Sequence, residues 1–208
     1  MTSAGAQRIL TAVQDILVER GLEDVTIRNV AAAAGLSIGA VQHHHKTKDD
    51  LIMAAMNEVS RNFIERVGSA VHPEASARQN LGAVCRILGG VDDESRTASV
   101  IWLSYASKAT TSSAVASAHQ ASWRLMEEGL TALLRQWNPD LARDDAATLM
   151  ALLDGLAIAR VTETDRMTSE RAQRLIDQYL NGLEPPSGQG SSKDLPDNGF
   201  MAQDTDLT

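Results

Sequence analysis

The chain has 208 residues, enough for one large or two small domains, and 43% of them are hydrophobic. Aromatic residues make up only 3%, which favours helices because strands draw on aromatic and β-branched residues. No apolar run is long enough to span a bilayer, and the first ten residues lack a basic-then-apolar signal pattern. Cys85 is the only cysteine, so no intrachain disulfide forms. We therefore expect an all-α, cytoplasmic protein.

The net charge of −8 argues by itself against a nucleic-acid partner, but the acidic residues are unevenly distributed. No Asp or Glu occurs in residues 25–48, a segment that holds Arg28, Lys46, Lys48 and three consecutive histidines. This acid-free segment is either a chance gap or the electrostatic footprint of a nucleic-acid site. Residues 184–208, by contrast, hold five acidic residues and one lysine. Because this end also has little to bury, we expect a disordered acidic tail over 185–208.

Hydrophobic periodicity predicts about nine helices and no strand of note. Gly21 should end the first helix, and Thr26, Ser37 and Thr47 each stand where a side chain caps the next one. The expected helices cover residues 7–20, 27–34, 38–45, 48–71, a segment from Pro73 to the "GG" at 89–90, one capped by Asp92 or Asp93, one from "TTSS" to 137, 144–162 and 169–183. The corresponding domains are 1–47 and 48–184, followed by the tail.

The three consecutive histidines, His43, His44 and His45, raise the question of a metal site. Neighbouring residues on a helix are turned by about 100°, so the three rings point in three directions. Zinc sites on a helix use histidines four positions apart, a pattern that these three do not form. We therefore expect no metal ion here, and nothing else in the sequence predicts a cofactor.

The helices over 27–34 and 38–45 are joined by the residues "GLS", which is the spacing of a helix-turn-helix. The second helix of such a motif enters the DNA major groove. On a helical wheel, Ile38, Val41 and His45 share the face that should turn to the core. A neutral histidine buried there needs a hydrogen-bond partner, or it costs on the order of 1–3 kcal/mol. The opposite face carries Gly39, Ala40, His43 and His44, with Gln42 at its edge.

Residues 8–52, "RILTAVQDILVERGLEDVTIRNVAAAAGLSIGAVQHHHKTKDDLI", resemble the TetR family of bacterial transcriptional regulators. Residues 101–130, "IWLSYASKATTSSAVASAHQASWRLMEEGL", more loosely resemble the branch that includes choline-response regulators. The resemblance implies a DNA-binding domain over 1–47 and an effector-binding, dimerising domain over 48–184. It implies a repressor that a small molecule releases from a palindromic operator. The chain departs from the family at Gln42, normally aromatic, and at His45, normally phenylalanine.

The resemblance also implies roles at the DNA. Thr26 would anchor phosphate, Arg28 would reach phosphate or a base edge, and Lys46 and Lys48 would bind phosphate. Gln42 remains able to pair with adenine N6 and N7. The other residues expected at base edges or phosphates are Ser37, Ile38, Gly39, Ala40, His43 and His44. The plainer alternatives are that Thr26 and Ser37 are only helix caps and that the lysines are ordinary surface charges.

Scarce residue types gather in the second half of the chain and suggest a ligand pocket. A buried acid beside aromatic rings would suit a cationic ligand, although core packing, or pairing of Asp154 with Arg160, is the simpler alternative. The pocket residues so predicted are Trp102, Tyr105, His119, Trp123, Met126 and Asp154. The last two helices carry apolar stripes that would form the bundle of a homodimer or else pack only their own domain. These residues are Leu149, Leu152, Leu156, Leu175, Ile176 and Tyr179.

Two other classes of function remain open. An enzyme lacks support, because the chain has no glycine-rich phosphate loop, no nucleophile elbow and no alignable Ser/His/Asp set. A thiol pair of Cys85 with His119 is conceivable, but Cys85 lies in an apolar helical stripe, so we expect no catalytic residue. A DNA-binding architectural protein without an effector is the second alternative. The size of the second domain argues against it.

Overall fold

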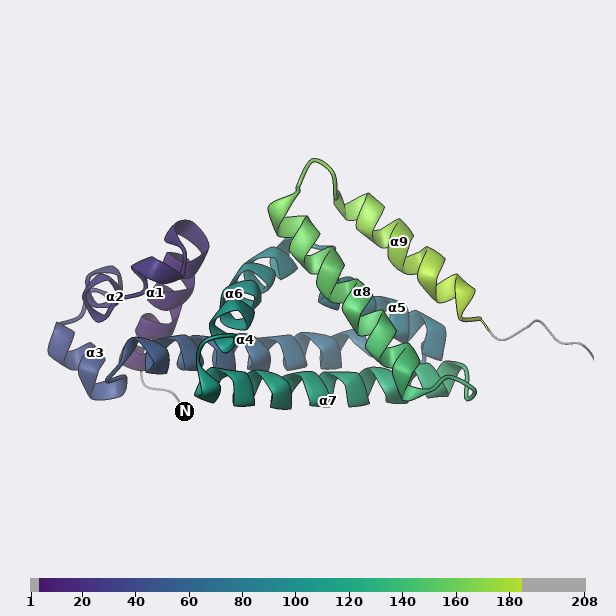
Figure 1. Cartoon of the computed structure of the whole chain (residues 1–208), viewed down its shortest axis with the longest axis horizontal. Coiled ribbons are helices and arrows are strands. Elements are labelled where there is room, and N and C mark those ends of the chain that lie inside the picture. Colours follow the sequence, from purple (N-terminus) through teal and green to yellow (C-terminus); the bar gives the residue numbers. More distant parts are fainter. Residues whose placement is uncertain (1–3, 185–208) are drawn as a thin grey trace, which may run out of the picture.

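The computed structural model describes residues 4–184, and within this part of the chain all regular secondary structure is helical (Figure 1). The all-α prediction is confirmed, whereas the predicted acidic tail over 185–208 lies outside the described residues. No helix within 4–184 is both long and apolar enough to cross a membrane. The elements are α1 (Ala4–Arg20), the 3-10 turn η1 (Leu22–Asp24), α2 (Ile27–Ala34), α3 (Ile38–His44), α4 (Lys48–Ala70), α5 (Ala77–Leu88), α6 (Asp93–Ala109), α7 (Ser113–Trp137), α8 (Arg143–Thr162) and α9 (Ser169–Gly182).

Side-chain caps begin α2, α3 and α4 at the predicted residues. Thr26 Oγ1 accepts the backbone N–H of Asn29 at 3.1 Å and so satisfies one of the free donors of the first turn of α2. Ser37 does the same for α3. At α4, Thr47 and the third helical residue Asp50 cap each other reciprocally. These bonds fix the angle at which each short helix meets the next.

Gly35 makes the turn between α2 and α3 possible. Its backbone is left-handed, with a φ of +61°, which glycine adopts without steric cost. A Cβ at this position would lie 2.7 Å from Arg8 Nη2. That same nitrogen donates to the carbonyl oxygen of Gly35 at 3.2 Å. The tight turn therefore also ties α1 to the helix-turn-helix.

The predicted helix start at Pro73 is wrong, and the third helix ends one residue earlier than expected. Pro73 does not begin a helix, because residues 71–76 form a turn and Ser76 caps α5, its Oγ accepting the N–H of Gln79. The third helix does not include His45, which follows it with an extended backbone at a φ of −140°. Its N–H closes the helix on the carbonyl of Val41.

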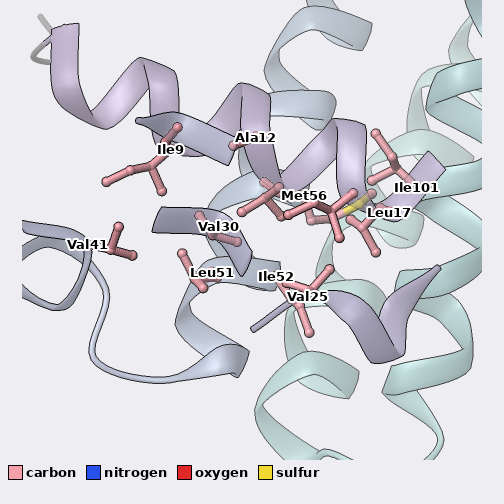
Figure 2. Packing of buried hydrophobic residues seen from close by; sticks show 14 of the residues in the cluster. Ile9, Ala12, Leu17, Val25, Val30, Val41, Leu51, Ile52, Met56 and Ile101 are labelled. Carbon is pink, nitrogen blue, oxygen red and sulfur yellow. The ribbon is translucent and has the colours of Figure 1, made fainter. Parts of the chain in front are cut away.

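Two hydrophobic cores organise the described residues, and α4 belongs to both. The first lies in the head, our term for α1, α2 and α3, and also takes in the first half of α4. Figure 2 shows Ile9, Val30, Val41 and Leu51 converging in this core. Ile101 of α6 and residues of α7 join it. The head therefore shares a hydrophobic core with helices of the second domain and is not connected to it only through a flexible linker.

The second core lies among α5, α7, α8 and α9. Its fully buried members include Leu81, Leu130, Leu149, Leu153 and Ile176. In Figure 1, α4 and α7 run in the same direction along the molecule, while α8 and α9 turn back on each other above them. This arrangement leaves α4 in contact with the head at one end and with the second domain along the rest of its length.

Candidate nucleic-acid interface and effector pocket

The helix α3 is held to the head by one side chain and presents most of the rest to solvent. Val41 is fully buried, whereas Gln42, His43 and His44 are exposed, as are Ser37 and Gly39. Ala40 is half-buried. An exposed helix whose N-terminus is free to approach a surface is what a major-groove reader needs.

Ile38 does not face the core as the helical wheel predicts, because 46% of its surface is exposed. The helix α3 has only seven residues, and Val41 in its middle makes the buried contact with the rest of the head. Ile38, the first residue of the helix, lies beyond this contact and remains exposed to solvent. An exposed isoleucine at the start of α3 is compatible with its predicted place at the base edges, where an apolar side chain can contact a thymine methyl group.

The three histidine rings lie next to one another in chain order. The rings of His43 and His44 meet edge to face with centroids 5.5 Å apart, and His45 turns back toward the protein. His45 is half-buried, not in the core as predicted. Burial lowers its pKa, the nearby His44 lowers it further, and Asp50 opposes both effects. Between residues 4 and 184, no three His, Cys, Asp or Glu side chains gather in a way that could hold a metal ion.

The basic residues of the acid-free segment differ in solvent exposure and in whether they already have a partner in the protein. Arg28 and Lys46 are exposed. Lys48 is half-buried, and its Nζ donates to the backbone carbonyl of Glu23 at 3.3 Å and lies 3.8 Å from the carboxylate of the same residue. Lys48 therefore fastens the start of α4 to η1, so a phosphate would have to compete with Glu23 for it.

A cavity of about 480 Å³ lies in the second domain, within the range of small-molecule sites. Four of the six predicted pocket residues line it: Trp102, Trp123, Met126 and Asp154. The scarce residue types do not point to its α4 and α5 walls, which include Val59, Phe63, Val67, Val84 and Ile87. The four-residue spacing of the three α4 residues signals an apolar face, but nothing in that signal separates a pocket wall from a core.

Asp154 is the acidic group of this cavity, and its carboxylate accepts the indole N–H of Trp123 at 3.1 Å. The rings of Trp102 and Trp123 stack with centroids 5.3 Å apart. Burial raises the pKa of the Asp154 carboxyl, and the Trp123 hydrogen bond opposes this in part. The site thus combines a desolvated acid with aromatic faces, and both favour a positive charge.

The alternative in which Asp154 pairs with Arg160 does not occur. Arg160 donates to the carbonyl oxygens of Gly90 and Met167 at 3.2 Å and 2.9 Å. The other charged residue in the cavity wall, Arg66, already binds Asp92 at 3.1 Å and lies 3.8 Å from Glu94. Within the described residues, Asp154 therefore has no cationic partner.

Tyr105 and His119 lie beside the pocket but do not line it. The Tyr105 ring meets His119 edge to face at 5.9 Å, and His119 lies 4.2 Å from Trp123. Tyr105 is buried in the head-side core, and its hydroxyl donates to Met53 Sδ of α4 at 3.6 Å. Burial lowers the pKa of His119. These aromatic contacts connect the pocket wall with α4.

The predicted dimer residues fall into two groups. Leu149, Leu156 and Ile176 are buried in the protomer's own second core, which leaves them little surface for a partner. Leu152, Leu175 and Tyr179 are only half-buried. The outer face of α8 is exposed and mostly small, and it consists of Ala147, Ala151, Gly155 and Ile158.

Cys85 is buried in the second core and does not approach a catalytic arrangement. Burial raises the pKa of its thiol to about 12. At neutral pH it is therefore protonated, and a protonated thiol is neither a nucleophile nor a metal ligand. His119 belongs to the aromatic group beside the pocket and does not join Cys85 in a pair.

Comparison with known proteins agrees with this geometry. Residues 9–55 match the family model described as "Bacterial regulatory proteins, tetR family", and residues 77–184 match "BetI-type transcriptional repressor, C-terminal". The transcriptional regulator BetI of Escherichia coli is 27% identical over 86% of this chain and 94% of its own length. The regulator PksA of Bacillus subtilis is 26% identical over 85% of this chain and 88% of its own length.

Solved structures show the same fold. A transcriptional regulator from Rhodococcus sp. Rha1 is 28% identical and superposes with a TM-score of 0.80 over 87% of this chain and 96% of its own. A regulator from Saccharomonospora viridis, solved in complex with choline, is 20% identical, with a TM-score of 0.76 over 84% of this chain and 94% of its own. These relatives are regulators and not enzymes. The chain belongs to the TetR family of bacterial transcriptional regulators and carries a BetI-type C-terminal domain.

Proposed function

We propose that this regulator is a homodimeric repressor that reads a palindromic operator with α3 and leaves it when an organic cation enters the pocket. The family supports DNA binding and a response to a small molecule in general. The observation that carries the finer proposal is Asp154, a half-buried carboxylate beside stacked tryptophan rings in a cavity of about 480 Å³, without a cationic partner among the described residues. We place its action in the cytoplasm, where bacterial operators lie.

Two features of the head support α3 as the reading helix. Val41 anchors it, while Ser37, Gly39, Gln42 and His43 remain exposed. Gln42 presents an amide that can bind adenine N6 and N7 together. Exposed Arg28 and Lys46 lie on either side in the sequence and would contact phosphates, which fix the register of the helix on DNA.

The outer face of α8 supports the homodimer. Ala147, Ala151 and Gly155 allow another helix to approach closely, and Ile158 is a large apolar residue exposed beside them. Half-buried Leu175 and Tyr179 on α9 would extend the contact. A symmetric pair would present two α3 helices to half-sites about one helical turn apart, which requires a palindromic operator.

The cavity supports an organic cation as the effector. A quaternary ammonium ion gains both from the charge of Asp154 and from the aromatic faces of Trp102 and Trp123. The Trp102 indole N–H is buried and has no acceptor among the described residues, so a hydroxyl or ester oxygen on the ligand would satisfy it. The choline bound to the regulator from Saccharomonospora viridis belongs to this chemical class.

The helix α6 supports a connection between the two sites. It carries Trp102 in the pocket wall and, one turn later, Tyr105 against Met53 of α4. A ligand that moves Trp102 would shift α4 and with it the spacing of the two heads. Because linkage is reciprocal, the cation must then weaken DNA binding by the same factor as DNA weakens cation binding. About 1–3 kcal/mol of coupling gives 5–150-fold release.

Selection from a random DNA pool with the purified chain tests the proposal. We expect a palindromic consensus that loses its preference at one base pair of each half-site in Gln42→Ala, and a dimer by light scattering. Choline or tetramethylammonium should then release the selected DNA from the native protein but not from Asp154→Asn. A non-palindromic consensus would contradict the dimeric reader. DNA binding that no ammonium ion weakens would contradict the effector and favour an architectural protein.

A further inference from the structure

The pocket is an elongated channel, which we define by its two long walls on α4 and α7. The α4 wall runs from Met56 to Val67, and the α7 wall runs from Ser122 to Leu133. At 1.5 Å per helical residue, each wall is roughly 16 Å long. Because α4 and α7 run in the same direction (Figure 1), the two walls follow one another from end to end.

The two ends of this channel differ in polarity. Asp154 is bound to Trp123, which stands at the first turn of the α7 wall. The remainder of that wall is apolar or small, from Leu125 and Met126 to Leu133. The α4 wall facing it carries Val59, Phe63 and Val67. Arg66 at the far end is already neutralised by Asp92 and Glu94, so it does not offer a free positive charge.

The rim of the channel is apolar as well. Ile64 on α4 and Leu125 on α7 both line it, yet 67% and 68% of their surfaces are exposed. Exposed apolar side chains on both sides of one opening lower the free energy of a ligand that itself has apolar surface. A small ammonium ion occupies only the Asp154 end and leaves this surface in water.

We propose that the channel takes an amphiphilic organic cation, with its ammonium head at Asp154 and Trp123 and an unbranched alkyl or acyl tail between α4 and α7. This inference rests on the cation site of the proposed function and adds the tail. Each methylene that enters the apolar part raises the affinity about fourfold, until the tail reaches the far end. Affinity therefore depends on chain length, and a head group alone binds weakly.

A homologous series of ligands tests the tail. The probes are tetramethylammonium and hexyl-, octyl- and decyltrimethylammonium, each kept below its micelle concentration, with alcohols of the same chain lengths as uncharged controls. Binding is read from quenching of tryptophan fluorescence and from the thermal shift of the full chain. We expect affinity to rise at each step of the ammonium series, and Asp154→Asn to remove the advantage of the ammonium ions over the alcohols.

A glycine in the α7 wall provides a selective block. Gly129 lines the channel, and a Cβ built there meets nothing within 4 Å, so Gly129→Leu adds bulk to the channel wall without a clash at its Cβ. We expect it to weaken decyltrimethylammonium at least tenfold and to leave tetramethylammonium unchanged. Gly68→Leu is the matched control, because Gly68 is also in a helix and unobstructed but lies outside the channel wall.

The outcomes separate the two proposals. If tetramethylammonium binds as well as the long-chain ions, or if Gly129→Leu weakens both alike, the tail is wrong and the cation site stands. If the alcohols bind as tightly as the ammonium ions, the head assignment to Asp154 is wrong, and the inference fails with it. If no ammonium ion of any length binds, the effector part of the proposed function fails first.

Discussion

Lys108 Nζ lies 3.1 Å from Asp49 Oδ1, and this ion pair joins the last turn of α6 to the first turn of α4. Both side chains are partly exposed, so the pair contributes little to the free energy of unfolding, about 0–1 kcal/mol. Its position matters more than its strength. The same helix α6 carries Trp102 in the channel wall, so Lys108 is a direct contact between a helix of the channel wall and the helix that supports the head.

We expect Lys108→Gln to reduce the coupling between the two sites while leaving the fold intact. The variant should bind both operator and cation, but a saturating cation should weaken its DNA binding by a smaller factor than in the native protein. The measurement is the operator Kd with and without ligand. Arg166→Gln, which breaks a surface pair with Glu163 away from α4, is the control. Equal coupling in Lys108→Gln and native protein would contradict this role.

We expect Asp154→Asn to stabilise the ligand-free protein at neutral pH. Burial raises the pKa of this carboxyl in the folded state, so the folded protein resists an ionisation that the unfolded chain undergoes near 3.8. The free energy of unfolding of the native protein therefore falls as the pH rises above that value. The asparagine side chain of the variant does not ionise, so it avoids this loss, and its amide oxygen can still accept the Trp123 N–H. The Tm difference should be positive at pH 7 and shrink toward zero in acid. A lower Tm for Asp154→Asn than for the native protein at pH 7 would contradict this destabilising effect of the Asp154 carboxylate.

The fold was largely predictable because its boundaries are local. Thr26, Ser37 and Thr47 cap helices with their own side chains, and Gly35 supplies the left-handed turn between α2 and α3. The misplaced elements lack such signals. Pro73 is compatible with a first helical turn, but Ser76 with Gln79 forms a better cap three residues later. Ile38 and His45 were misplaced because a wheel assumes a helix long enough to have a continuous buried face.

The pocket was only partly predictable, for a different reason. Trp102, Trp123 and Asp154 are unusual residues in an apolar helical context, so the sequence marks them. Val59, Phe63 and Ile87 are ordinary, and whether such residues line a cavity or fill a core depends on how far apart the helices stand. Tyr105 was predicted in the pocket, but it packs one turn further along α6, against Met53. That difference is set by tertiary packing, which the spacing of residues does not encode.

The exposed residues of the head should separate into those that contact base edges and determine sequence preference, and those that contact phosphates and contribute to the affinity for any DNA. We expect Gln42→Ala to cost about 1–3 kcal/mol on the best operator and to relax the preference at one base pair of each half-site. Lys46→Ala should weaken all sequences alike and reduce the salt dependence of binding by about one phosphate contact per head. Kd values for operator and scrambled DNA at several salt concentrations measure both effects.

Lys48→Ala tests how far an ion-paired lysine contributes to the same interface. Because its Nζ is held by Glu23, we expect a smaller change in salt dependence than for Lys46→Ala and a measurable loss of thermal stability. An equal salt effect for the two lysines would mean that Lys48 leaves Glu23 when DNA binds.

His45→Phe should raise the Tm by about 2–4 °C, corresponding to about 1 kcal/mol, because it replaces a half-buried imidazole with the ring that the family usually carries here. The pH dependence gives a sharper test. Burial, and then His44, lower the pKa of His45 in the folded protein, so below about 6.5 the unfolded chain binds a proton that the folded one does not. Native stability should therefore fall as the pH drops through 6.5, and His45→Phe should lose less. The exposed His43→Phe is the control, and His119 contributes equally to all three proteins. Parallel Tm curves for native and His45→Phe between pH 8 and pH 5 would show that this ring is hydrated and imposes no penalty.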